Sequence, residues 1–197
     1  KEIGLRDFAE LKELLLSTDL YFEEQSTLKS PQDRLHDYSK KVKQSIEMVE
    51  DSIDMDAIAD LCDDIYKYQR VAIFGLLKAG AVSLNLQGDL LMLGKQVYTN
   101  ISYQQQMEYI MSANEDDLII IFSYTGSYFD YQEIRALKNK LKIPKIWFIS
   151  SEKSEFPTFL DRIITFKSLQ DQNSHPYQLQ FIASLIAQEY SRKHKFK

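Results

Sequence analysis

A cluster of hydroxyl side chains follows an apolar run near the middle of the chain. Residues 117–122 read Asp-Leu-Ile-Ile-Ile-Phe, which predicts a buried strand, and residues 123–127 read Ser-Tyr-Thr-Gly-Ser. Hydroxyl groups donate hydrogen bonds, glycine lets backbone N–H groups approach a ligand, and the N-terminus of a following helix adds partial positive charge. Three hydroxyls around one glycine exceed what helix capping needs. The segment therefore predicts an anion site that suits the phosphate of a small metabolite.

A second loop of this kind follows an earlier apolar run, Val71–Phe74, which Gly75 ends. We expect Gly75 to serve the backbone, because glycine permits close packing. Lys78 lies on the first turn of the next predicted helix, where it is either a solvated side chain or a point charge for a phosphate. In open parallel sheets the ligand crevice lies outside the carboxyl ends of the strands, where the winding reverses. Both loops leave such ends.

The elements that position these loops alternate between strand and helix from Arg70 onward. Five strands are predicted, at residues 71–75, 96–98, 118–122, 145–149 and 162–166. Helices are predicted up to Leu93 and over residues 104–112, 128–141 and 176–194, and earlier ones begin at Asp7, at Asp33 and at Asp54 or Asp56. Repeated strand–helix units with apolar strands indicate a parallel sheet covered on both faces. The predicted fold is an α/β three-layer sandwich with a five-stranded parallel sheet, preceded by N-terminal helices.

Composition limits the classes of function. The chain has 197 residues, enough for one ample α/β domain with a helical appendage, and its single cysteine, Cys62, reads as a core thiol. There is no signal-peptide pattern or membrane-spanning run, so we expect a cytoplasmic setting without membrane contact. Residues 1–69 carry 9 basic and 17 acidic side chains, and residues 70–197 carry 15 and 12. Neither part is the strongly basic surface that DNA binding requires, although the second suits an anionic ligand.

At the two loops the sequence resembles the SIS (sugar isomerase) domain, over roughly residues 34–193. The family pattern is a strand with a Gly-x-Gly-x-Ser loop, then a second strand that ends in Ser-x-Ser-Gly-x-Thr. Gly75 fits the first loop, and Ser123, Thr125 and Gly126 fit the second. The resemblance implies a five-stranded parallel α/β sandwich that binds a phosphosugar.

The chain departs from this pattern at three positions. Leu77 stands where the family has its second glycine, and Ala79 stands where it has the serine that donates to phosphate. Tyr128 replaces the last threonine, although Ser127 beside it offers a substitute donor. The loop after the second strand of the pattern therefore keeps most of the residues expected to bind phosphate, whereas the loop after Gly75 has lost two of them.

The resemblance also implies two contacts away from these loops. Ser150 and Ser151 follow the fourth strand, where the family often has hydroxyls, and the last helix of related SIS proteins lies near the ligand, which makes His175 a candidate contact. The ligand-binding residues expected from the sequence and the resemblance together are Gly75, Lys78, Ser123, Thr125, Gly126, Ser127, Ser150 and His175.

The N-terminal end of the chain resembles a narrower group of proteins that contain an SIS domain. Lys1–Lys12, read as Lys-Glu-Ile-Gly-Leu-Arg-Asp-Phe-Ala-Glu-Leu-Lys, is similar to the tail of the helix-turn-helix domain in RpiR-type transcriptional regulators. The resemblance implies that residues 1–30 are the end of a DNA-binding domain and a linker, and that residues 31–197 are an SIS effector domain. It implies a homodimer that senses a sugar phosphate to control carbohydrate genes, and that contacts DNA only through a helix-turn-helix domain whose recognition helix precedes Lys1.

Two alternatives remain open. A phosphosugar isomerase would need a carboxylate or imidazole to move a proton between adjacent carbons, and the candidates are Glu108, Glu133 and His175. Both glutamates read as solvated helix residues, and there is no catalytic triad, zinc spacing or nucleotide loop, so the sequence indicates a non-enzyme without cofactor or metal. A dimerisation module with a decayed pocket is the other alternative, on the evidence of Leu77 and Ala79. Tyrosines near the predicted pocket indicate either packing or a self-association surface.

Overall fold

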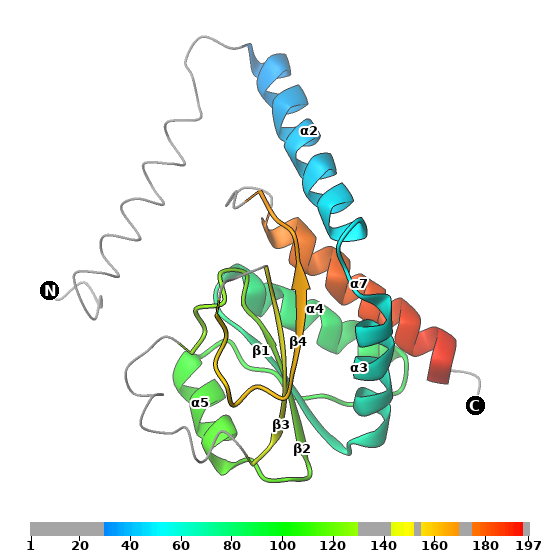
Figure 1. Cartoon of the computed structure of the whole chain (residues 1–197), viewed down its shortest axis with the longest axis vertical. Coiled ribbons are helices and arrows are strands. Elements are labelled where there is room, and N and C mark those ends of the chain that lie inside the picture. Colours follow the sequence, from blue (N-terminus) through cyan, green and yellow to red (C-terminus); the bar gives the residue numbers. More distant parts are fainter. Residues whose placement is uncertain (1–29, 130–142, 152–154, 170–174, 195–197) are drawn as a thin grey trace, which may run out of the picture.

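The structure is a computed structural model that describes residues 30–129, 143–151, 155–169 and 175–194 (Figure 1). The alternation of strand and helix predicted after Arg70 is confirmed. The elements, in chain order, are α2 (Pro31–Glu50), α3 (Met55–Lys67), β1 (Arg70–Gly75), α4 (Lys78–Met92), α5 (Tyr103–Ser112), β2 (Asp117–Phe122), β3 (Lys145–Ser151), β4 (Arg162–Phe166) and α7 (His175–His194). The helix predicted from Asp7 lies outside the described residues, and so does the helix predicted over residues 128–141 beyond Phe129.

The described part of the chain forms one parallel sheet of four strands in the order β1-β2-β3-β4. The prediction of a fifth strand at residues 96–98 was wrong. This segment does lie beside β1, but it forms only one parallel bridge, between Tyr98 and Ala72. Tyr98 exchanges two backbone hydrogen bonds of 2.8 Å with Val71 and Ile73, and the Thr99 side chain then donates to the Ile73 carbonyl at 2.6 Å. A hydroxyl therefore takes the place of the next backbone ladder bond, and the pairing stops.

The sheet is covered on both faces, as predicted (Figure 1). Side chains alternate along each strand, so Val71 and Ile73 face one layer of helices while Ala72 and Phe74 face the other. The first layer holds α3, α4 and α7, and the second holds α5. The strands read as continuous apolar runs because both of their faces are buried. This is the three-layer arrangement expected from the sequence.

The helix α2 begins at a capping box and extends beyond the body of the protein (Figure 1). Ser30 accepts a hydrogen bond from the Asp33 backbone at 3.2 Å, and the Asp33 carboxylate accepts one from the Ser30 backbone at 3.2 Å. The buried residues of α2 are Ser45 and Val49, near its C-terminal end. The N-terminal half of α2 is largely exposed, so α2 is anchored mainly through its last turns.

The single cysteine lies in the core, as predicted. Cys62 is fully buried on α3, and its thiol donates to the Ile186 carbonyl of α7 at 3.4 Å. Burial raises the pKa of this thiol to about 12, so it is almost entirely protonated at neutral pH. None of the helices in the described ranges is both long and apolar enough to span a bilayer.

Candidate anion site at the carboxyl edge of the sheet

The two predicted loops leave neighbouring strands at the same edge of the sheet. Gly75 ends β1 and is paired in register with Phe122, which ends β2. After β1 the chain passes to one side of that strand, at Tyr98, and then to the other side, at β2. The winding therefore reverses at β1, and the crevice that such folds use for ligands lies between the carboxyl ends of β1 and β2. This is where the two loops meet.

The loop after β2 presents two exposed hydroxyls above one buried hydroxyl. Ser123 is 8% exposed, and its Oγ accepts a hydrogen bond from the Tyr128 backbone N–H at 3.2 Å. Thr125 and Ser127 are exposed, and their hydroxyl oxygens lie 2.6 Å apart in a mutual hydrogen bond. Gly126 has φ +73°, a backbone conformation that favours glycine, and its N–H donates to the Ser123 carbonyl at 3.0 Å. The loop thus holds two adjacent hydroxyls toward solvent on a fixed turn.

The hydroxyls that end β3 support this loop from beneath. The Tyr124 carbonyl accepts from the Ser151 backbone at 3.1 Å, from the Ser151 hydroxyl at 2.6 Å and from the Ser150 hydroxyl at 3.4 Å. Ser150 is fully buried, and Ser151 is 3% exposed. Ser150 was predicted as a ligand contact, but in this structure its hydroxyl is directed at the protein backbone.

The loop after β1 keeps a turn that normally requires glycine. Leu77 has φ 51° and ψ −118°, the angles of the first central residue of a type II′ turn, and the Leu76 carbonyl accepts from the Ala79 N–H at 3.0 Å across that turn. A non-glycine residue in such a region costs about 1–3 kcal/mol. The Leu77 side chain is 95% exposed. A turn that favours glycine is thus formed here with leucine at its strained position.

Close packing joins this turn to the strand before it. A Cβ on Gly75 would lie 2.7 Å from both the carbonyl carbon and the carbonyl oxygen of Ala79, and one on Gly80 would lie 3.1 Å from the Gly75 carbonyl oxygen. Glycine at position 75 therefore lets the first turn of α4 rest directly on the end of β1. Lys78, the exposed first residue of α4, therefore follows closely on the carboxyl end of β1.

Gln106 joins the two loops, a role that the sequence analysis missed. Its side chain is fully buried on α5, and its amide donates to the Gly75 carbonyl at 2.9 Å and to the Asn100 carbonyl at 2.6 Å. Its amide oxygen accepts from the Tyr128 hydroxyl at 2.7 Å. Burial raises the pKa of Tyr128 well above its usual value, so this hydroxyl keeps its proton and donates. Tyr128 therefore points away from the crevice, and does not replace the family threonine as a ligand donor.

A chain of hydrogen bonds runs from the β2 loop to α2. The Tyr124 hydroxyl bonds to the Ser168 hydroxyl, which donates to the Gln178 side chain at 3.2 Å. Gln178 lies fully buried on α7, and its amide donates to the Ser45 carbonyl on α2 at 2.8 Å. The loop of the candidate site and the projecting helix are thus linked through three side chains.

The remaining predicted residues have different surroundings. His175 is the first residue of α7, and its side chain lies outside the described residues. Glu108 is on α5 and accepts a hydrogen bond from Gln104 at 3.0 Å on the exposed surface, whereas Glu133 lies outside the described residues. Among the residues that the structure places, there is no group of three or more carboxylate, imidazole or thiol side chains that could hold a metal ion.

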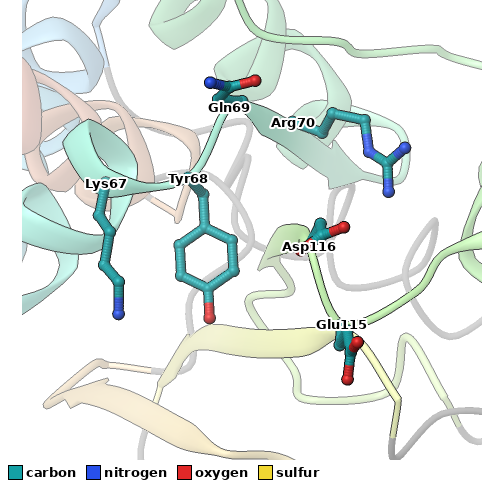
Figure 2. Close-up of a pocket in the computed structure, with 6 residues that line it drawn as sticks. All are labelled: Lys67, Tyr68, Gln69, Arg70, Glu115 and Asp116. Atoms are coloured by element: carbon teal, nitrogen blue, oxygen red, sulfur yellow. The ribbon is translucent and has the colours of Figure 1, made fainter.

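A separate concavity of about 530 Å³ lies at the opposite edge of the sheet (Figure 2). It is lined by Lys67, Tyr68, Gln69, Arg70, Glu115 and Asp116. Both signs of charge meet there, and the Arg70 guanidinium is already paired with Asp117 through two hydrogen bonds of 3.0 Å. It lies at the amino ends of β1 and β2, whereas ligands in this class of fold bind at the carboxyl ends. We therefore place the candidate site at the two loops and not in this concavity.

Comparison with solved structures identifies the fold. The sugar isomerase domain of an RpiR transcription factor from Sphaerobacter thermophilus has a TM-score of 0.66 and 15% identity, covering 80% of this chain and 89% of that one. The Vibrio vulnificus NanR protein complexed with ManNAc-6P has a TM-score of 0.70 and 12% identity, covering 97% and 71%. A phosphoheptose isomerase from Francisella tularensis has a TM-score of 0.62 and 11% identity, covering 84% and 100%.

The chain has the fold of the SIS domain. No family model matches it, and no curated protein matches its sequence. Identities of 11–15% establish fold alone, and this fold is shared by regulators and isomerases. The choice between these two functions must therefore rest on the site.

Proposed function

We propose that this chain binds a sugar phosphate at the carboxyl edge of its sheet and acts as the effector-sensing domain of an RpiR-type transcriptional regulator. The observation that carries the proposal is the pair of exposed hydroxyls, Thr125 and Ser127, held 2.6 Å apart on a fixed turn after β2, the strand that pairs with the one preceding α4. Hydroxyls and the N-terminus of a helix both favour a phosphate group. Lys78 and Ser123 complete the set, with Lys78 supplying charge and Ser123 a hydroxyl that can still donate its own proton.

A path of hydrogen bonds connects the candidate site with α2. A sensing role explains this path better than a catalytic role does. The path from Tyr124 through Gln178 to Ser45 ends on α2, the helix that extends beyond the body. In our proposal, residues 1–30 end a helix-turn-helix domain, residues 31–197 form the effector domain of a cytoplasmic homodimer, and α2 carries the response toward DNA. An effector shifts such an equilibrium only through unequal affinity for two arrangements.

A thermal-shift screen against sugar phosphates tests the binding. A ligand at about 100 times its dissociation constant adds roughly 2.7 kcal/mol to the free energy of unfolding, which gives a clear rise in melting temperature. We expect that rise for at least one sugar phosphate, but not for inorganic phosphate or the unphosphorylated sugar. The double variant Thr125→Ala, Ser127→Ala should abolish it. Ser112→Ala, which removes an exposed hydroxyl at the C-terminal end of α5, should not.

Other outcomes would favour the alternatives. Turnover of a phosphosugar by the purified protein, lost in His175→Ala or Glu133→Gln, would establish an isomerase. If no sugar phosphate raises the melting temperature, the pocket no longer binds such a ligand. Ala79 at the serine position of the family would be in accord with that result.

The link to α2 makes a separate prediction. When the effector identified by the screen binds, we expect amide hydrogen exchange in the last turns of α2, near Ser45, to slow by roughly tenfold, because the ligand restrains the loop that is hydrogen-bonded to it. Tyr124→Phe removes the hydroxyl that begins the path and should abolish this protection while the protein still binds. Tyr109→Phe removes a tyrosine hydrogen bond to Asp117, away from the site, and should leave it unchanged. Protection of α2 that survives in Tyr124→Phe would contradict the proposed path.

A further inference from the structure

The exposed half of α2 carries a local cluster of positive charge. Residues 1–69 as a whole are strongly acidic, with 9 basic and 17 acidic side chains. Within them, residues 34–44 have the opposite sign, because their only acidic residue is Asp37 and their basic residues are Arg34, Lys40, Lys41 and Lys43. A concentration of one sign of charge on a projecting helix attracts a partner of the other sign.

Two of these lysines lie on the outer side of α2. Lys40 and Lys43 are exposed, and neither forms an ion pair with any residue that the structure describes. The helix is anchored through Ser45 and Val49, and at 3.6 residues per turn the two lysines lie about 120–180° around the helix axis from these buried residues. They are also neighbours three residues apart, so they form one basic row that faces away from the body of the protein.

This basic row is confined to the part of α2 that extends beyond the body (Figure 1). Glu47 and Glu50 follow Lys43 on the next turns, and the last turn of α2 has no basic residue. The sign of the charge therefore changes where the helix reaches the body. A partner bound to the basic row would not need to contact the sheet or the helices that cover it.

We propose that the basic row, Lys40 and Lys43, contacts the phosphate backbone of DNA, as a second contact beside the helix-turn-helix domain. Duplex DNA carries one negative charge per about 1.7 Å of its axis, so each lysine of a row can neutralise a phosphate. Lysine is a flexible point charge, and phosphate contacts of this kind position a protein without reading sequence. The basic row therefore adds affinity and orientation, whereas sequence recognition stays with the DNA-binding domain.

The position of the basic row links it to the candidate site. The hydrogen-bond path from the loop after β2 ends at the Ser45 carbonyl, two residues after Lys43. A ligand that restrains this loop therefore acts on α2 directly beside its basic row. The inference rests on the regulator in the proposed function, because that function is what favours DNA over other polyanions.

Fluorescence anisotropy with a labelled duplex of about 20 base pairs and arbitrary sequence tests the contact in this chain. We expect weak binding that falls steeply with salt. The double variant Lys40→Gln, Lys43→Gln should lower the association constant at low salt by roughly tenfold, and should reduce the slope of its logarithm against the logarithm of salt concentration by about 1.8. Gln44→Lys adds a charge at an exposed position one turn after Lys40, and should steepen this slope by about 0.9.

Lys67→Gln, Lys167→Gln is the matched control, because it removes two exposed lysines outside α2 and changes the net charge equally. It should change the affinity for DNA by less than about twofold, since salt screens charges beyond roughly 10 Å. Three results would overturn the proposal: equal losses in the two double variants, no DNA binding by the native chain, or binding to phosphatidylserine–phosphatidylcholine vesicles but not to DNA.

The thermal-shift screen separates this inference from the proposed function. Lys40→Gln, Lys43→Gln should keep the rise in melting temperature that a sugar phosphate gives, because neither lysine belongs to the candidate site. A chain that binds a sugar phosphate but not DNA would overturn the inference alone. A chain that binds DNA through the basic row but no sugar phosphate would overturn effector sensing and support the inference.

Discussion

Gly75→Ala is expected to destabilise the protein by about 3 kcal/mol. The added Cβ would lie 2.7 Å from two backbone atoms of Ala79, and a backbone cannot rotate away as a flexible side chain can. The first turn of α4 must therefore move off the end of β1, and Lys78 must move with it. Urea unfolding followed by circular dichroism measures the loss, and sugar-phosphate binding should weaken in the fraction that remains folded.

Gly88→Ala is the matched control for this change, because it lies on the same helix and involves the same two residue types. No heavy atom lies within 4 Å of the Cβ that it would add. Since glycine in a helix interior is about 1 kcal/mol less favourable than alanine, Gly88→Ala should leave stability unchanged or raise it by up to that amount. Equal losses in the two variants, at equal protein concentration, would show that close packing at Gly75 is not the cause.

Gln106→Leu is expected to cost a similar amount, about 3 kcal/mol, by a different mechanism. The leucine would fill much of the same space, but it would leave the Gly75 carbonyl, the Asn100 carbonyl and the Tyr128 hydroxyl without the hydrogen bonds that Gln106 makes to them. A buried polar group without a hydrogen-bond partner destabilises the folded state, because its loss of hydration is not compensated. Because Gln106 holds the two loops together, the variant should also lower affinity for a sugar phosphate.

Gln104→Leu provides the control on the same helix. Gln104 is exposed and bonds only to Glu108 among the contacts described, so its loss should change stability by less than about 0.5 kcal/mol. Tyr128→Phe completes a double-mutant cycle with Gln106→Leu. The double variant should lose less stability than the sum of the single variants, because the two side chains share one hydrogen bond. Strict additivity would mean that this bond contributes nothing.

Most of the fold could be predicted from the sequence because its signals are local. Four apolar runs became four strands, and Asp54, one of the two starts predicted for α3, caps that helix by accepting from the backbone of Asp56 and Ala57. The fifth strand could not be predicted correctly from its composition. Its pairing with β1 ends where the Thr99 side chain takes over the hydrogen bond, a detail of geometry and not of propensity.

The candidate site was predictable in place but not in the roles of its residues. Residue type and position located Thr125 and Ser127, but could not show that Ser150 is buried beneath the loop or that Tyr128 turns inward. Gln106 was missed because a run of three glutamines reads as solvated. A signal was present, since Gln106 lies three residues after Tyr103 and four before Ile110, on the face of α5 that packs against the sheet.

The turn at Leu77 shows that a motif and the shape it specifies can separate. Leu77 has dihedral angles that glycine adopts most easily, although two of the three defining residues of the Gly-x-Gly-x-Ser pattern, at positions 77 and 79, are absent. Surrounding structure, and not the residue itself, holds this conformation.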